Sequence, residues 1–240
     1  MVDPIVLEWS RDQLQDSKLT KLSRQSRVKP MVWLSEDLDG AKRIVKDCRG
    51  LPFYSRWLAK LIMWREYRIM LRLHGIAAVP QVRERIDSHA FSMTFMAGEP
   101  LSEENFSFAP RRISDDLLGV IEKLHERHVY HLDLRQRQNI LLGDGLKAQI
   151  IDFGSSWAPW WGARMIFGKL LVGVDRSAAL KYLVRFAPQK MTFLEAQTLL
   201  RGLWLRRIWI FSPYHSHGVT DTLKSIVAKG PPSTEGNHKI

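Results

Sequence analysis

Short apolar runs alternate with polar residues over the first hundred positions, and one long helical pattern interrupts them. Strand-like runs at 31–35 and 41–46 precede a helical stretch from about 54 to 73, and further strand-like runs follow at 81–86 and 90–96. The order strand, strand, helix, strand, strand predicts that the first part of the chain is rich in β-structure.

The pattern becomes helical after about residue 98. Apolar residues that recur at intervals of three and four predict one buried helical stripe, formed by Ile113, Leu117, Ile121 and Leu124. Two short apolar runs follow at 139–142 and 148–151, and Gly143-Asp-Gly between them predicts a hairpin turn. From Gly154 to about residue 210 the pattern is again mainly helical.

These patterns predict an α+β fold in three parts. A small β-rich lobe with one helix spans residues 1–97, and a helical lobe spans residues 98–228. The low-complexity end, residues 229–240, predicts a disordered tail.

Composition narrows the class of protein. The chain has 240 residues, 45% hydrophobic and 25% charged, which suits one domain or two small lobes and excludes a disordered or fibrous protein. The single cysteine, Cys48, permits no internal disulfide and no cysteine-rich zinc site. Because no secretory signal and no apolar window of membrane-spanning length are found, we expect a cytoplasmic protein.

The chain is strongly basic. Its 36 Lys and Arg residues exceed its 25 Asp and Glu residues and give a net charge of +11, which indicates an anionic partner: nucleotide, nucleic acid, phospholipid or phosphorylated glycan. Basic and aromatic residues are concentrated in residues 160–215, where the only acids are Asp175 and Glu195. That mixture suits a peripheral contact with an anionic membrane surface, or a pair of core helices with a solvated basic face.

Two motifs that carry chemistry flank the expected hairpin. His131-Leu-Asp-Leu, followed by Asn139, comes directly before it, and Ile151-Asp-Phe-Gly closes it. The pair resembles the catalytic loop and the Asp-Phe-Gly metal loop of the protein-kinase-like fold. Either motif alone is weak evidence, but the two in this order and at these positions are specific.

This resemblance implies a two-lobe fold, with a small β-rich N-lobe and a reduced helical C-lobe, that binds ATP and Mg²⁺. The carboxylate of Asp152 and the amide oxygen of Asn139 would then bind the metal ion, because Mg²⁺ prefers hard oxygen ligands. Asp133 would accept the proton of the attacking hydroxyl or orient that hydroxyl. A structural role for Asp133 as a loop cap is the alternative.

The same resemblance implies a cation on the third strand, to pair with the ATP phosphates, and an acid on the following helix. Lys46 and Glu66 occupy these positions. The helical neighbours of Glu66 are apolar, so an inward-facing Glu66 would need a cation, and Lys46 is the natural partner. A helix register that exposes Glu66 to solvent is the alternative.

Residues 96–101, Met-Ala-Gly-Glu-Pro-Leu, resemble the hinge between kinase lobes, where backbone groups bind adenine. This places the base beside Phe95, Met96 and Ala97. An ordinary loop after an edge strand is the other interpretation.

Several features distinguish the chain from eukaryotic protein kinases. It has no Gly-x-Gly-x-x-Gly before Lys46, no activation segment ending in Ala-Pro-Glu, and fewer than 90 residues after Asp152. The bacterial lipopolysaccharide kinases, which phosphorylate Kdo or core heptose, resemble it more closely over roughly residues 40–155. The matching positions are Lys46, Arg65-Glu66, Val79-Pro80, Gly98, His131–Leu134 and Ile151–Phe153. RIO-type atypical kinases share several of these features.

The spacing of the catalytic motif differs by one residue from that of the family. Asn139 lies six residues after Asp133, whereas the family places its metal-binding asparagine five residues after, where this chain has Gln138. We favour a one-residue bulge that brings Asn139 to the metal.

Two further residues of this segment have other expected roles. His131 is expected to pack beneath the loop and to form a hydrogen bond with the backbone. Arg135 either contacts a phosphate or is a surface charge.

The leading hypothesis is an ATP-dependent phosphotransferase that acts on a hydroxyl of a lipid-linked sugar at the cytoplasmic face of the membrane. Its expected partners are ATP, a glycolipid or sugar acceptor and an anionic membrane surface. The alternatives are an atypical serine/threonine protein kinase of RIO type, or an ATP-binding pseudokinase that binds a membrane or a partner. Nucleic-acid binding is not expected, because no recognition motif accompanies the charge.

Overall fold

An antiparallel sheet forms the first part of the chain. The computed structural model describes residues 18–23, 27–37, 40–205 and 217–230. The five strands lie in the order β1 (Lys18–Lys21), β2 (Met31–Glu36), β3 (Lys42–Asp47), β5 (Ala90–Thr94) and β4 (Val82–Arg85). Both neighbours of the central strand β3 run antiparallel to it, and Lys46 on β3 lies opposite Val32 on one side and Phe91 on the other.

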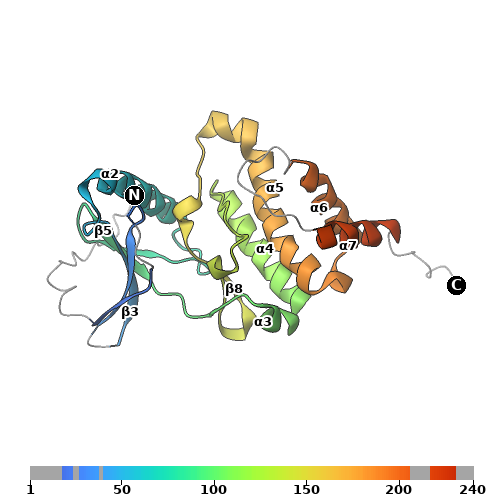
Figure 1. Cartoon of the computed structure of the whole chain (residues 1–240), viewed down its shortest axis with the longest axis horizontal. Coiled ribbons are helices and arrows are strands. Elements are labelled where there is room, and N and C mark those ends of the chain that lie inside the picture. Colours follow the sequence, from blue (N-terminus) through green and yellow to red (C-terminus); the bar gives the residue numbers. More distant parts are fainter. Residues whose placement is uncertain (1–17, 24–26, 38–39, 206–216, 231–240) are drawn as a thin grey trace.

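Helix α2 (Phe53–Arg72) packs against this sheet (Figure 1). Its inward residues Ala59, Met63, Ile69 and Met70 are buried, as the helical spacing predicts. An aromatic cluster joins helix and sheet: the rings of Tyr67 on α2 and Phe91 on β5 meet edge to face with centroids 5.4 Å apart. The sheet and α2 therefore share one apolar core.

A second, three-stranded sheet follows in the chain. It consists of β6 (Glu99–Pro100), β7 (Ile140–Leu142) and β8 (Ala148–Ile150), all antiparallel. The expected hairpin is present as β7 and β8, joined by a short 3₁₀ turn, η2 (Asp144–Leu146), in which Gly145 has a left-handed φ of 65°. The sheet lies between the five-stranded sheet and the helices that follow (Figure 1).

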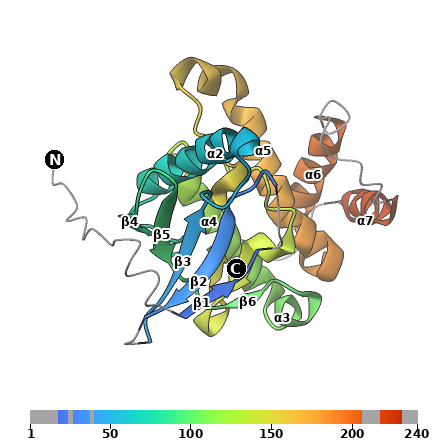
Figure 2. The same ribbon diagram turned by 60° about the vertical axis from the view of Figure 1, so that its left-hand side comes forward.

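The remaining elements are mainly helical. α3 (Glu103–Ser107) and α4 (Pro110–Glu126) precede the small hairpin, and α5 (Trp161–Phe186), α6 (Phe193–Leu205) and α7 (His217–Ala228) follow it. Short 3₁₀ turns are η1 (Arg137–Asn139), η3 (Phe153–Ser155) and η4 (Pro188–Lys190). α4 packs against α5, and α6 and α7 lie on the outer side of α5 (Figures 1 and 2).

The α+β class predicted from the sequence is confirmed. The expected buried stripe of α4 is also confirmed, because Ile113, Leu117, Ile121 and Leu124 are all fully buried. The expected order of strands and helix in the first part is correct but lacks β1, which is exposed along its whole length and so shows no apolar alternation. Apart from its first two residues, the expected tail at 229–240 lies outside the described residues.

In the described part of the chain, no helix is both long enough and apolar enough to cross a bilayer.

Gly98 offers a test of the junction between the two sheets. A Cβ atom at Gly98 would lie 2.9 Å from the backbone carbonyl oxygen of Leu142 on β7, whereas a Cβ atom at Gly119 on α4 would meet nothing within 4 Å. We expect Gly98→Ala to lower the free energy of unfolding by about 1–3 kcal/mol, because backbone atoms cannot move aside easily. The matched control Gly119→Ala should raise it by about 0.5–1 kcal/mol. Urea denaturation measures both, and equal effects of the two substitutions would contradict the close approach.

Candidate active site

The ammonium group of Lys46 lies between two carboxylates. Its Nζ is 2.6 Å from Oε1 of Glu66 on α2 and 3.2 Å from Oδ1 of Asp152, which follows β8. The Lys46 and Glu66 side chains are only 9% and 3% exposed, whereas the Asp152 side chain is 57% exposed. Glu66 thus faces inward and is paired with Lys46, as its apolar neighbours predict, and is not exposed to solvent.

The charges of this cluster stabilise one another. Burial by itself would lower the pKa of Lys46, but the carboxylates of Glu66 and Asp152 outweigh burial and hold that pKa above its usual value. The Lys46 ammonium in turn lowers the pKa of Asp152. Lys46 and Asp152 are therefore both charged at neutral pH.

The loop after β8 turns sharply at Asp152. The φ of Asp152 is 62°, in the left-handed region, and its side chain accepts a hydrogen bond from the Gly154 N–H, a local contact that favours this conformation. Phe153 then points inward and is fully buried; its ring meets the ring of His131 edge to face, with centroids 5.0 Å apart. Arg65 of α2 donates a hydrogen bond to the Gly154 carbonyl. The loop is therefore fixed to α2 and to the chain around His131.

Two amide side chains hold the carboxylate of Asp133. Nε2 of Gln136 donates to Oδ2 of Asp133 at 2.6 Å, and Nδ2 of Asn139 donates to the same oxygen at 3.2 Å. Asn139 also donates to the backbone carbonyl of Asp133 at 3.0 Å. Asp133 remains half-buried rather than fully enclosed, so its carboxylate is oriented and still accessible.

Asn139, and not Gln138, lies beside Asp133. Asn139 is buried and Gln138 is exposed, because the 3₁₀ turn η1 accommodates the additional residue before β7. The carbonyl oxygen of Asn139 accepts a hydrogen bond from the N–H of Ile151 at 2.9 Å. Since Ile151 directly precedes Asp152, this contact brings the two expected metal-binding residues to adjacent positions.

His131 has the structural role expected from the sequence. It is fully buried, and its Nε2 donates a hydrogen bond to the carbonyl oxygen of Ile151 at 3.1 Å. Burial lowers the pKa of His131, so its ring is neutral at pH 7. The buried histidine therefore joins the Asp133 loop to the Asp152 loop.

Asp175 on α5 is a site residue that the sequence pattern did not indicate. It is fully buried, and its two oxygens accept hydrogen bonds from the backbone N–H groups of His131 and Leu132, both at 2.8 Å. Oδ2 of Asp175 is also 3.0 Å from Nε2 of His125. Leu132 has a φ of 65°, which is costly for leucine, and the hydrogen bond to Asp175 holds it there.

A signal for Asp175 was nevertheless present in the sequence. The four residues three and four positions away on the helix are all apolar, and three of them, Leu171, Ala178 and Ala179, are buried in the structure. The same reasoning that predicted an inward-facing Glu66 applies to Asp175.

Phe95, Met96 and Ala97 lie in the connection between β5 and β6. β5 pairs with β3, so this connection continues the strand that lies beside Lys46. Phe95 and Ala97 are exposed and Met96 is half-buried. The connection is thus open to solvent, as binding of an adenine base would require, and within the described part of the chain no hydrogen bond or ion pair joins these residues to Lys46, Glu66 or Asp152.

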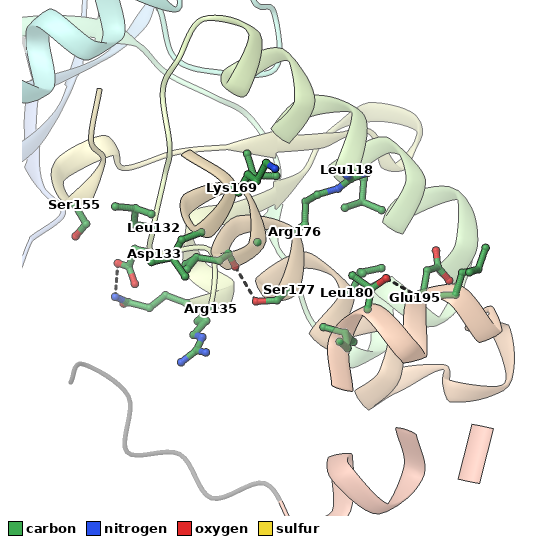
Figure 3. Close-up of a pocket in the computed structure, with 18 of the residues that line it drawn as sticks. Leu118, Leu132, Asp133, Arg135, Ser155, Lys169, Arg176, Ser177, Leu180 and Glu195 are labelled. Atoms are coloured by element: carbon green, nitrogen blue, oxygen red, sulfur yellow. Dashed lines mark hydrogen bonds between the residues drawn. The ribbon is translucent and has the colours of Figure 1, made fainter. Parts of the chain in front are cut away.

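A pocket of about 1040 Å³ opens beside Asp133 (Figure 3). One end contains Leu132, Asp133, Gly154 and Ser155, and the pocket extends along α5 to Glu195 and its neighbours on α6. Leucine and valine side chains form much of its wall, and four cations line it: Arg65, Arg135, Lys169 and Arg176. Lys46, Phe95, Met96 and Ala97 do not line this pocket. The pocket therefore reaches Asp133 and Gly154 but not the side chains of Lys46, Glu66 and Asp152.

Arg135 belongs to the wall of this pocket and is half-buried. Burial lowers the pKa of its guanidinium, although an arginine remains charged at neutral pH. Its backbone carbonyl accepts a hydrogen bond from Lys181 of α5 at 3.2 Å. Arg135 therefore lines the pocket, and its contact with a phosphate stays a prediction.

Within the described residues, no group of three or more His, Cys, Asp or Glu side chains is arranged to hold a metal ion. The donor set of Asp152 and Asn139, one carboxylate and one amide, instead suits Mg²⁺, which usually takes one or two protein oxygens together with phosphate oxygens and water. The site can therefore offset the charge of a phosphate chain and orient a hydroxyl.

No model of a known protein family matches the sequence, and no curated protein is similar to it.

Removing the charge of Lys46 and removing the charge of Asp152 should have different effects on the free energy of unfolding. We expect Lys46→Met to lower the free energy of unfolding by about 3–5 kcal/mol, because Glu66 then stays buried without its cation. Asp152→Asn should change it by less than about 1 kcal/mol, because the Asp152 side chain is largely exposed. Adding Glu66→Gln to Lys46→Met should restore part of the loss. Denaturant unfolding of the unmodified protein, the three variants above and Glu66→Gln alone measures these differences and the coupling of Lys46 to Glu66.

The pH dependence of this effect has a defined sign. Because the pKa of Lys46 is raised in the folded protein, its stabilising contribution is present below the ordinary value of 10.5 and is lost as the pH rises through the folded value. Above neutral pH, the stability difference between the unmodified protein and Lys46→Met should therefore persist until the pH is high; at acid pH it should also shrink, as Asp152, whose folded pKa is lowered by Lys46, is protonated. A difference that already disappears near neutral pH would contradict the charge assignment.

Asp175 predicts an effect on both stability and loop geometry. Asp175→Ala leaves two buried N–H groups without an acceptor, and each costs about 1–3 kcal/mol. Asp175→Asn should be milder, since one oxygen remains. The exposed Asp221 on α7 provides the matched control Asp221→Ala, which should be close to neutral. Thermal unfolding and amide exchange at His131 and Leu132 would show whether the loss is local to the loop.

Proposed function

We propose that this chain is an ATP-dependent phosphotransferase that moves the γ-phosphate to a hydroxyl of a lipid-linked sugar at the cytoplasmic face of the membrane. In this proposal, the five-stranded sheet with α2 and the helical part form the two lobes of a protein-kinase-like fold. The observation that carries the proposal is the position of the Lys46 ammonium between Glu66 and Asp152. Lys46 lies on β3, Glu66 on α2 and Asp152 in the loop after β8.

The chain's own residues fit ATP and Mg²⁺. Lys46 would pair with phosphate oxygens, and Glu66 keeps the ammonium charged and in place. Asp152 and Asn139 would hold Mg²⁺, since the amide nitrogen of Asn139 is already bonded to Asp133 and its oxygen remains for the metal. The bound metal ion would offset the charge of the β- and γ-phosphates.

The adenine base would lie against the backbone of Phe95, Met96 and Ala97. These residues follow β5, the strand that pairs with β3 beside Lys46. This arrangement would place the base at one end of the nucleotide and Lys46 at the phosphates.

Asp133 is the proposed base or orienting group for the acceptor hydroxyl. Among the described residues, both side-chain hydrogen bonds to Asp133 fall on Oδ2, which leaves Oδ1 for a hydroxyl. The 1040 Å³ pocket begins at this residue. An acceptor bound there would present its hydroxyl to Asp133.

The lining of the pocket supports an amphiphilic acceptor. Its apolar wall includes Leu118, Leu170, Leu180 and Leu199, and its cations include Arg135 and Lys169. Apolar chains and anionic sugar substituents occur together in lipid-linked glycans, and Kdo-lipid A or core lipopolysaccharide is the corresponding acceptor of the family that the sequence resembles. The acceptor proposal rests on this lining.

The assay incubates the protein with Mg²⁺ and γ-labelled ATP and offers Kdo-lipid A, core lipopolysaccharide and a generic protein in parallel. Label should enter the glycolipid only, and Asp152→Ala should abolish it. Asp133→Asn should lower the rate at least about 10²-fold while leaving ATP binding nearly unchanged. The exposed Asp144 gives the matched control Asp144→Asn, which should retain full activity.

Other outcomes would replace the proposal. Label on protein would favour an atypical protein kinase of RIO type. ATP binding without label on any acceptor would favour a pseudokinase. Full activity of Asp133→Asn would show that Asp133 is not the base or orienting group.

A further inference from the structure

The first turns of α5 carry an exposed apolar cluster. Trp160, Trp161, Met165 and Ile166 are 72%, 68%, 69% and 74% exposed. In Figures 1 and 2 these turns project beyond the rest of the molecule on the side where α2 lies. Large apolar side chains gathered on a projecting surface indicate a contact with something outside the chain.

Helix α2 presents a second exposed apolar stripe. Phe53, Trp57 and Leu61 are 83%, 65% and 62% exposed and are spaced four residues apart, so they lie on one face of the helix. The same face continues with Arg65, Arg68 and Arg72, which are also exposed. The stripe therefore changes from apolar to basic along the helix.

The exposed stripe of α2 and the exposed cluster of α5 are each followed, along the same helix, by a cation that lines the pocket beside Asp133. Arg65 is four residues after Leu61 on α2 and lines the pocket. On α5, Lys169 is four residues after Met165 and also lines the pocket. Each helix thus has exposed apolar residues in its first turns and, farther along, a cation that lines the pocket.

The charges on these helices favour one kind of partner. The only acid in α2 is Glu66 and the only acid in α5 is Asp175, and both are buried. The outward faces therefore combine tryptophan and aliphatic side chains with arginine and lysine and carry no negative charge. This is the composition of a surface that inserts at the interface of an anionic bilayer, where aromatic rings and the stems of basic side chains are partly buried and the cations meet lipid phosphates.

We propose that the exposed stripe of α2 and the first turns of α5 form a membrane-binding surface for anionic phospholipid, which places the pocket entrance at the bilayer. This inference rests on the proposed function for its purpose, because a lipid-linked acceptor would enter the pocket from the membrane. Vesicle binding requires neither ATP nor acceptor, so the two proposals can fail separately.

The experiment measures flotation of the full chain with vesicles of phosphatidylcholine alone or with one third phosphatidylglycerol. We expect binding only to the anionic vesicles, and binding should weaken as salt concentration rises. The variant Trp161→Ser/Ile166→Ser should bind at least tenfold more weakly. Phe108→Ser, which removes an apolar side chain that is 75% exposed at the end of α3, should bind like the unmodified protein.

A second pair of variants separates local from overall charge. Arg68→Glu/Arg72→Glu changes the basic part of the α2 stripe, and Lys190→Glu/Lys224→Glu makes the same change in net charge at η4 and α7. We expect the first pair to weaken anionic-vesicle binding at least tenfold and the second pair to have a much smaller effect. Near-ultraviolet circular dichroism and thermal unfolding check that each variant is folded.

Three results would overturn the proposal: no binding to anionic vesicles, equal binding to neutral vesicles, or equal losses in the test and control variants. Loss of a dimer in Trp161→Ser/Ile166→Ser without loss of vesicle binding would assign the surface to a second copy of the chain. Phosphotransfer to a detergent-dispersed acceptor should persist in this variant, since neither residue lines the pocket. If this variant lost phosphotransfer to the dispersed acceptor but still bound vesicles, that result would also contradict the assignment of Trp161 and Ile166 to a membrane contact.

Discussion

Lys46 carries a positive charge in a position where solvent can hardly reach it, and this constrains three parts of the chain at once. A buried ammonium is stable only when carboxylates meet it, and its partners come from α2 and from the loop after β8. If α2 moved away from the sheet, Lys46 would lose Glu66, the nearer of its two carboxylate partners. The pairing therefore fixes the position of α2 against β3, and the contact of Arg65 with Gly154 extends this constraint to the next loop.

The buried carboxylate of Asp175 constrains the loop that contains Asp133. Its oxygens bond to the backbone at His131 and Leu132, and so they hold a left-handed residue directly before Asp133. The rings of His131 and Phe153 then connect this loop to the one that contains Asp152. Each of the two loops is held by a buried charged group on a different element, so the relative positions of Asp133 and Asp152 depend on both groups.

The sequence predicted those parts of the site that leave a local pattern. Glu66 was expected to face inward because an acid lay among apolar residues at helical spacing. In η1, Asn139 is buried and Gln138 is exposed, whereas the predicted binding of a metal ion by Asn139 stays a prediction. The hydrogen bonds of Asp175 were not predictable, because they join residues more than forty positions apart. The pocket depends on how α5 and α6 pack, and β1 has only exposed residues, so neither produces a periodic signal.

Helices α2 and α5 distribute charge in the same way, and this links stability to ligand choice. Each helix has one acid, which is buried and bonded to a cation or to backbone N–H groups, and each exposes several basic residues. The negative charges that stabilise the fold are therefore removed from the surface, and the basic residues outside are not neutralised by acids of the same helix. Arg176 of α5, which pairs with Glu122 of α4, is a partial exception farther along the pocket. Near the pocket entrance the electrostatic potential should consequently favour anions, whether these are phosphates of a nucleotide, an acceptor or a lipid surface.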